Sequence, residues 1–100
     1  MTAEEGWQLI EDNRAKIDAL DRKLVELLNE RTRLVENIGQ AKEALDLPVK
    51  ESSREDDVFR NILKHNAGPI PPEALRRIFE RLIEEMRGLQ GMRRQSSAKP

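Results

Sequence analysis

The sequence contains no cysteine, and this absence removes two common ways of holding a short chain together. Without cysteine there is neither a disulfide framework nor a thiolate metal site. The single histidine, His65, is too few for a catalytic zinc site, which usually takes several such ligands. We therefore expect no metal site in this chain.

The sequence also lacks an excess of either charge, and it has no long apolar run. Eighteen Lys and Arg against nineteen Asp and Glu give a net charge of -1, so there is no overall basic field for nucleic acid or an anionic membrane. No apolar segment approaches the roughly 20 residues that a membrane-spanning helix needs. The acidic N-terminus does not look like a signal peptide. We expect a soluble cytoplasmic protein that binds neither nucleic acid nor a membrane.

The most regular feature is an apolar stripe in a proline-free segment from Gly6 to about Asp46. Its positions recur in alternating steps of three and four residues, which predicts one face of a single α-helix ending near Leu47, just before Pro48. Forty helical residues measure roughly 60 Å, about twice the width of a compact domain of this size. The helix cannot bury its stripe alone, so the pattern favours dimerisation. The stripe positions are Ile10, Asn13, Ile17, Leu20, Leu24, Leu27, Arg31, Leu34, Ile38, Ala41 and Leu45.

Two shorter helices are expected after the long one. Ser52 and Glu55 have the spacing of a capping box, which predicts a second helix that starts there and is ended by Asn66, Gly68 and Pro69. Pro71 and Pro72 suit the start of a third helix. Residues 91–100 are polar and almost free of apolar side chains, so we expect a flexible tail. The predicted fold class is all-α, with three helices per chain in an intertwined antiparallel homodimer.

Two cations interrupt the apolar pattern of the long helix. Arg31 stands between Leu27 and Leu34, where a leucine would be expected. Since an unpartnered buried guanidinium is costly, Arg31 either meets a carboxylate inside the fold or binds an anionic ligand. Lys42 follows eleven residues later on nearly the same azimuth, roughly 16 Å along the axis. By itself, Lys42 is better explained as a solvated lysine at a helix end.

Arg14 borders the same stripe but lies roughly 25 Å from Arg31 along the helix, too far for one small ligand to touch both in one chain. A two-fold axis near Leu24 or Val25 would bring Arg14 of one chain opposite the segment from Arg31 to Lys42 of the other. Dimerisation would then bury both stripes and assemble two equivalent cationic sites.

Three further polar residues are candidates, and two of them have a simpler structural explanation. Arg54 lies four residues before Val58, which predicts that it points toward the core side of the second helix. Glu55 could be needed only as a cap. Gln90 could project inward from the end of the third helix or belong to a frayed end.

The run NRAKIDALDRKLVELLNERTRLVENIGQAK, followed by PVKESSRE, resembles the all-helical chorismate mutases over roughly residues 7–90. The resemblance joins Arg14, the I-x-x-L-D segment, the E-R pair, the G-x-A-K ending and the later R-E pair in the right order. It implies that residues 1–90 are a chorismate mutase domain, which rearranges chorismate to prephenate in phenylalanine and tyrosine biosynthesis. It implies no cofactor.

The resemblance also implies roles for individual residues. Arg31 and Arg54 of one chain and Arg14 of the other would bind the substrate carboxylates, with Lys42 contributing to one of them. Lys42 and Gln90 would donate hydrogen bonds to the ether oxygen, and Arg31, Lys42 and Gln90 form the expected catalytic set. Glu55 would accept from the ring hydroxyl, helped by the backbone around Glu51. Met86 departs from the pattern, because it stands where relatives carry a serine hydroxyl.

Two other functions are compatible with the same residues. An isochorismate-pyruvate lyase would share the helical dimer and similar Arg, Lys and Gln positions. A non-catalytic dimerisation or regulatory module, such as one that binds another enzyme of aromatic biosynthesis, would need Arg31, Lys42 and Arg54 to be matched by internal carboxylates.

Overall fold

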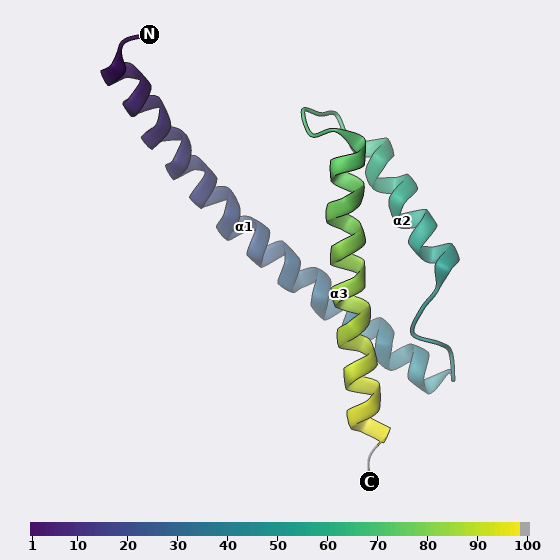
Figure 1. The fold of residues 1–100 in the computed structure, drawn as a ribbon. Helices are drawn as coiled ribbons and strands as arrows, with labels where there is room; N and C mark the ends of the chain where they lie inside the picture. Colours follow the sequence, from purple (N-terminus) through teal and green to yellow (C-terminus); the bar gives the residue numbers. More distant parts are fainter. Residues whose placement is uncertain (99–100) are drawn as a thin grey trace. The chain divides into compact units, whose positions relative to one another are not determined.

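The structure is a computed structural model that describes residues 1–98, and three α-helices account for its regular structure (Figure 1). They are α1 (Ala3–Ala44), α2 (Ser52–His65) and α3 (Pro72–Ala98). The predicted all-α class with three helices is confirmed. Within these residues, no helix combines the length and the apolar character needed to cross a bilayer. The chain divides into two compact units, residues 1–33 and the residues from Leu34 onward.

The first unit is the N-terminal part of α1. The helix starts at Ala3, earlier than the predicted start at Gly6, because the Thr2 hydroxyl accepts a hydrogen bond from the Glu5 backbone N–H at 3.1 Å. This contact satisfies one of the donors that the first turn of a helix leaves without a partner. Glu4 and Glu5 in the first turn add a favourable interaction with the positive end of the helix dipole.

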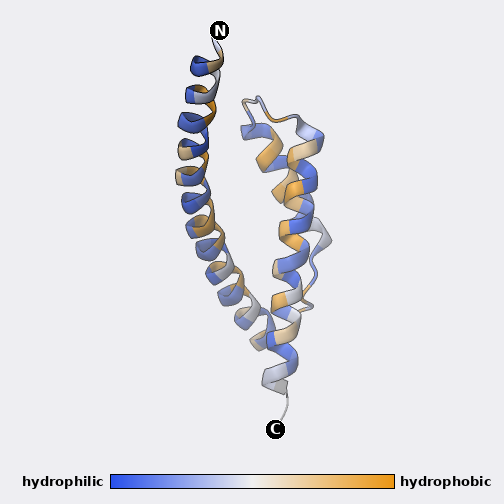
Figure 2. Cartoon of the chain, turned by 60° about the vertical axis from the view of Figure 1, so that its left-hand side comes forward, coloured by the Kyte–Doolittle hydropathy of each residue, from blue (hydrophilic) through white to orange (hydrophobic). Residues whose placement is uncertain are grey.

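The apolar stripe of this unit is exposed. Ile17 retains 52% of its accessible surface, Leu20 58%, Leu24 54% and Leu27 59%. Figure 2 shows apolar residues along one side of α1 and hydrophilic residues along the other. An isolated helix has no interior, so burial of such a stripe requires contact with another surface.

A Schellman motif ends α1 within the second unit. The Asp46 N–H donates to the Glu43 carbonyl at 3.1 Å, and the Leu47 N–H donates to the Lys42 carbonyl at 2.7 Å. Asp46 adopts the left-handed conformation that this motif requires, with φ of 57°. The last helical residue is Ala44, so the helix ends three residues before the predicted Leu47.

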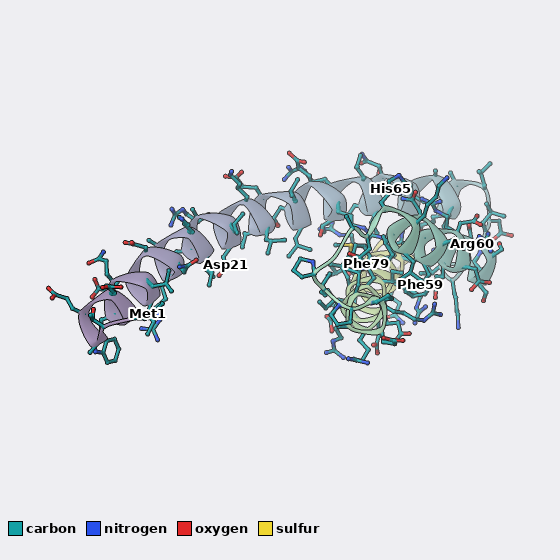
Figure 3. All side chains as sticks on the ribbon, turned by 90° about the horizontal axis from the view of Figure 1, so that it is seen from above. Met1, Asp21, Phe59, Arg60, His65 and Phe79 are labelled. Carbon is teal, nitrogen blue, oxygen red and sulfur yellow. The ribbon has the colours of Figure 1, made fainter. Side chains whose placement is uncertain are left out.

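Helices α2 and α3 pack against each other as an antiparallel pair (Figure 1). Phe59 of α2 and Met86 of α3 are the most buried apolar residues, with 8% and 6% of their surface exposed. Phe59 and Phe79 both belong to this pair (Figure 3). The Arg76 guanidinium lies 4.2 Å from the centroid of the Phe59 ring, which adds a cation–π contact. The core of the second unit therefore lies between α2 and α3.

The predicted capping box at the start of α2 is wrong. Ser52 is the first helical residue, and the N-cap is Glu51, which makes no side-chain capping bond. Glu55 does not fold back to the helix end, because its carboxylate pairs with Arg87 of α3. Arg54, which was predicted to point toward the core side of α2, is exposed in the single chain.

The connection from α2 to α3 follows the predicted turn residues. Asn66 is the C-cap of α2, its amide donates to the Ile70 carbonyl at 2.9 Å, and its side-chain oxygen accepts from the Gly68 N–H at 3.0 Å. Gly68 has a φ of 78°, which glycine adopts without steric cost. The third helix begins at Pro72, as predicted.

The third helix extends well past its predicted end. Residues 91–98 are helical, so the helix continues into the segment predicted to be a flexible tail, whereas Lys99 and Pro100 lie outside the described residues. Three contacts hold this extension. Arg93 pairs with Glu36 at 2.8 Å, Arg94 Nη1 donates to the Leu47 carbonyl at 2.7 Å, and the Ser97 hydroxyl donates to Glu43 at 2.8 Å. These long-range partners compensate for the lack of apolar side chains in the segment.

Candidate active site

Lys42 is a buried cation at the C-terminal end of α1. Only 9% of the residue is exposed. Its Nζ donates to the Val49 carbonyl at 2.8 Å and lies 3.4 Å from Glu51 Oε1. Both partners belong to the connection after α1, which the Schellman motif directs back over the last turn. The interpretation of Lys42 as a solvated lysine is therefore wrong.

The contacts of Lys42 leave part of its hydrogen-bonding capacity unused. A lysine ammonium has three N–H donors, and Val49 and Glu51 are its partners among residues 1–98. One donor thus remains for a ligand. A buried positive charge with a spare donor attracts an oxygen that carries negative charge.

Gln90 is the second buried polar residue, and it lies against the same stretch of α1. Only 9% of it is exposed, and its Nε2 donates to the Val35 carbonyl at 2.7 Å. Gly39 also faces its side chain. Val35, Gly39 and Lys42 are separated by four and three residues, so they share one face of the helix. The structure therefore places Gln90 and Lys42 on one face of the end of α1, and the interpretation of Gln90 as a frayed terminal residue is wrong.

Glu55 belongs to a charged pair between α2 and α3. Its Oε2 lies 2.7 Å from Nη1 of Arg87, and the two side chains are 24% and 32% exposed. The pair fixes the carboxylate while leaving Oε1 as a second acceptor. The neighbouring Arg54 is exposed, and among residues 1–98 it has no carboxylate within ion-pair distance.

Met86 is part of the packed core. It lies four residues before Gln90 and is only 6% exposed, and its thioether cannot replace the donor of a serine hydroxyl. Met86 and Gln90 lie on the same side of α3, one turn apart, so this side of the helix carries an apolar residue followed by a polar one. A cavity of about 210 Å³ includes Gln90 in its lining, together with Glu36, Gly39, Gln40, Glu43, Arg93, Arg94 and Ser97.

The remaining predicted residues, Arg14 and Arg31, belong to the first unit. Arg14 is exposed, and Arg31 is half-buried. In the second unit, Lys42 lies beside Glu51, and Gln90 contacts the face of α1 that carries Lys42. Among residues 1–98, no cluster of three or more His, Asp or Glu side chains could hold a metal ion.

Sequence reasoning missed Arg87 and the close approach of Gly39 to Gln90. Arg87 follows the buried Met86 directly, a position that usually faces the edge of a helix pair, and nothing in its local pattern distinguishes it from other surface arginines. The glycine in the G-x-A-K ending was a detectable signal, because glycine inside a helix often marks a close approach of two elements.

The comparisons with known proteins agree with these features. The sequence pattern of the family described as "Chorismate mutase type II" matches residues 13–91. The chorismate mutase of Methanocaldococcus jannaschii is 32% identical over 81 residues, which cover 77% of this chain and 79% of that protein. The structure of the Helicobacter pylori chorismate mutase in complex with prephenate has a TM-score of 0.81 at 25% identity, and the match covers 92% of this chain and 99% of that one.

Longer relatives also match. The bifunctional chorismate mutase/prephenate dehydratase of Aquifex aeolicus is 36% identical over 78 residues, and the match covers 74% of this chain but only 22% of that protein. The chain therefore spans about a fifth of the length of such bifunctional relatives.

The fold and the buried donors define an all-helical protein with a small polar site at the end of its long helix. The matches to the family pattern and to a relative of similar length identify it further: the chain belongs to the chorismate mutase type II family.

Proposed function

We propose that this chain catalyses the rearrangement of chorismate to prephenate, a step of aromatic amino acid biosynthesis. Membership of the family supports the proposal, as does the similarity to a structure that contains prephenate. The observation that carries it is the pair of buried donors, Lys42 and Gln90, on one face of α1. The family pattern ends at residue 91, which supports residues 1–90 as the catalytic domain.

The reaction needs orientation and charge stabilisation. One ether C–O bond of chorismate breaks while a new C–C bond forms within the same molecule, so no nucleophile is required. Negative charge develops on the ether oxygen, and fixed donors in a site shielded from water stabilise it. Lys42 would offer its remaining N–H. The amide of Gln90 has two N–H groups, of which the Val35 carbonyl takes one, so the other is available for the substrate.

The carboxylates of the substrate would be bound by arginines. Arg31 and Arg54 of one chain and Arg14 of the other are the proposed ligands, with Lys42 contributing to one carboxylate. The exposure of Arg14 and Arg54 in the single chain supports this role, because within residues 1–98 neither side chain is paired with a carboxylate.

The ring hydroxyl would be held by the segment at the start of α2. Glu55 would accept its hydrogen bond, with the backbone around Glu51 assisting. The ion pair with Arg87 supports this role, because it anchors the carboxylate and leaves an acceptor oxygen. The lack of a hydroxyl donor at Met86 costs on the order of 1 kcal/mol of substrate binding, which weakens the site without abolishing it.

The proposed functional unit is an antiparallel homodimer. The exposed stripe from Ile17 to Leu28 supports it, because large apolar surfaces on water-soluble chains mark interfaces. A two-fold axis near Leu24 or Val25 would bury both stripes and bring Arg14 of each chain to the site of the other.

A direct assay tests the proposed function. Purified protein mixed with chorismate is expected to produce prephenate without added metal or cofactor, detected as chorismate depletion and by chromatography of the product. The same protein mixed with isochorismate is expected to release no pyruvate. Formation of salicylate and pyruvate would instead identify a lyase, and inactivity toward both compounds would favour a non-catalytic module.

A further inference from the structure

Gly39 lies where the side chain of Gln90 crosses α1. A Cβ atom added at Gly39 would lie 3.2 Å from Gln90 Cγ, 3.4 Å from Nε2 and 3.6 Å from Cδ. The first distance is shorter than the usual separation of 3.5–4.0 Å between carbon atoms in contact. An added methyl group therefore requires Gln90 to move.

Gln90 cannot make that movement without displacing its side-chain amide. The closest atom is Cγ, in the middle of the side chain, so a displacement there is carried to the amide beyond it. The residue is 9% exposed, and its Nε2 is held by the Val35 carbonyl one turn before Gly39. Moving Cγ away from α1 would lengthen this bond or turn the amide.

Glycine at this position is unfavourable for the helix itself. In the interior of a helix, glycine is less stable than alanine because it loses more backbone freedom on folding. Gly39 has an ordinary helical backbone, so no turn or positive φ requires it. The close contact with Gln90 is the feature of this position that a Cβ atom would disturb.

We propose that Gly39 is a positioning residue for catalysis: the missing side chain sets the place of the Gln90 amide relative to Lys42. The proposal rests on the proposed function, in which that amide donates to the ether oxygen. An enzyme whose chemistry depends on orientation is sensitive to small displacements, and misplacement by about 1 Å can cost a hundredfold in rate.

The test compares two glycine substitutions in the full chain. Gly39→Ala is expected to lower kcat about three- to tenfold, because the contact requires a displacement of a few tenths of an ångström, with a smaller change in KM and with helicity and dimerisation unchanged. Gly88→Ala is the matched control, because a Cβ there has nothing within 4 Å, and its kcat should stay within twofold of wild type. A Gly39→Ala enzyme as fast as the control would overturn the proposal.

A double-mutant cycle separates positioning from a general structural effect. In a Gln90→Ala background, Gly39→Ala should cause no further loss of kcat, because the displaced group is already absent. An equal fold-loss in both backgrounds would contradict the proposal. The NMR signals of the Gln90 side-chain amide should also shift in Gly39→Ala and remain in place in Gly88→Ala. A wild-type enzyme without chorismate turnover would overturn the proposed function, whereas an active wild type with an unchanged amide signal in Gly39→Ala would overturn only this inference.

Discussion

Replacement of Lys42 by alanine is expected to lower kcat/KM for chorismate by at least about a hundredfold, or roughly 2.7 kcal/mol, while the dimer stays intact. The ammonium is a buried positive charge that would donate to the ether oxygen, and its loss removes a charged donor that water cannot replace in an enclosed site. Steady-state prephenate formation measures the effect, and size-exclusion chromatography checks the dimer.

Two controls make this result interpretable. Lys42→Ala also leaves the Val49 carbonyl without its donor and Glu51 without its counter-charge, so the melting temperature must be compared with wild type. Lys64→Ala, which removes an exposed lysine of α2, should keep full activity. If Lys42→Ala retained activity within twofold of wild type, the assignment of Lys42 to the reaction would be wrong.

A charge placed in the apolar stripe of α1 is expected to abolish both the dimer and the activity. In the antiparallel arrangement, Leu24 lies near the two-fold axis, so Leu24→Glu would bring two carboxylates close together in an apolar interface. We expect a monomer, partial unfolding of α1, and a loss of kcat/KM of at least about a hundredfold, since each site would lose the Arg14 of the other chain. Analytical ultracentrifugation and circular dichroism measure the first two effects.

The matched control for this variant is Ala15→Glu. Position 15 is exposed and nine residues from Leu24, which places it on the opposite side of the same helix. The same charge is introduced there, but outside the stripe, so this variant should remain dimeric and active. A dimeric, active Leu24→Glu protein would show that the stripe is not the interface.

The approximate ranges of the three helices could be predicted from the sequence, because local sequence signals determine where a helix begins and ends. The long apolar stripe and Pro48 indicate one long helix, and Pro72 and Asn66 mark the ends of the connection between α2 and α3. The helix ends were less accurate, since the Thr2 cap and the Schellman motif at Asp46 each moved a boundary by about three residues.

Features that depend on distant partners escaped prediction. Ser52 and Glu55 have the spacing of a capping box, but Arg87 is 32 residues away in sequence and takes the Glu55 carboxylate. Residues 91–98 have the composition of a tail, and they are helical because their polar side chains reach Glu36, Glu43 and Leu47. A charged segment is ordered or frayed according to such contacts, which local composition does not reveal.

For the candidate site, too, the sequence indicated the residues but not their surroundings. The sequence pointed to Lys42 and Gln90 through family resemblance, and each also had a simple explanation as a solvated or terminal residue. Their burial depends on the connection after α1 and on the packing of α3, which only the folded chain reveals. The roles of Arg14, Arg31 and Arg54 remain predictions, because they concern a ligand and a second chain.

A mixing experiment tests most directly whether two chains share each active site. Arg14→Ala and Arg31→Ala proteins should each be nearly inactive, but unfolding and refolding them together should restore about a quarter of wild-type activity. Half of the dimers would then be mixed, and each mixed dimer would contain one site with both arginines intact. A mixture no more active than the average of its two parents would show that Arg14 serves its own chain, and the shared site would be refuted.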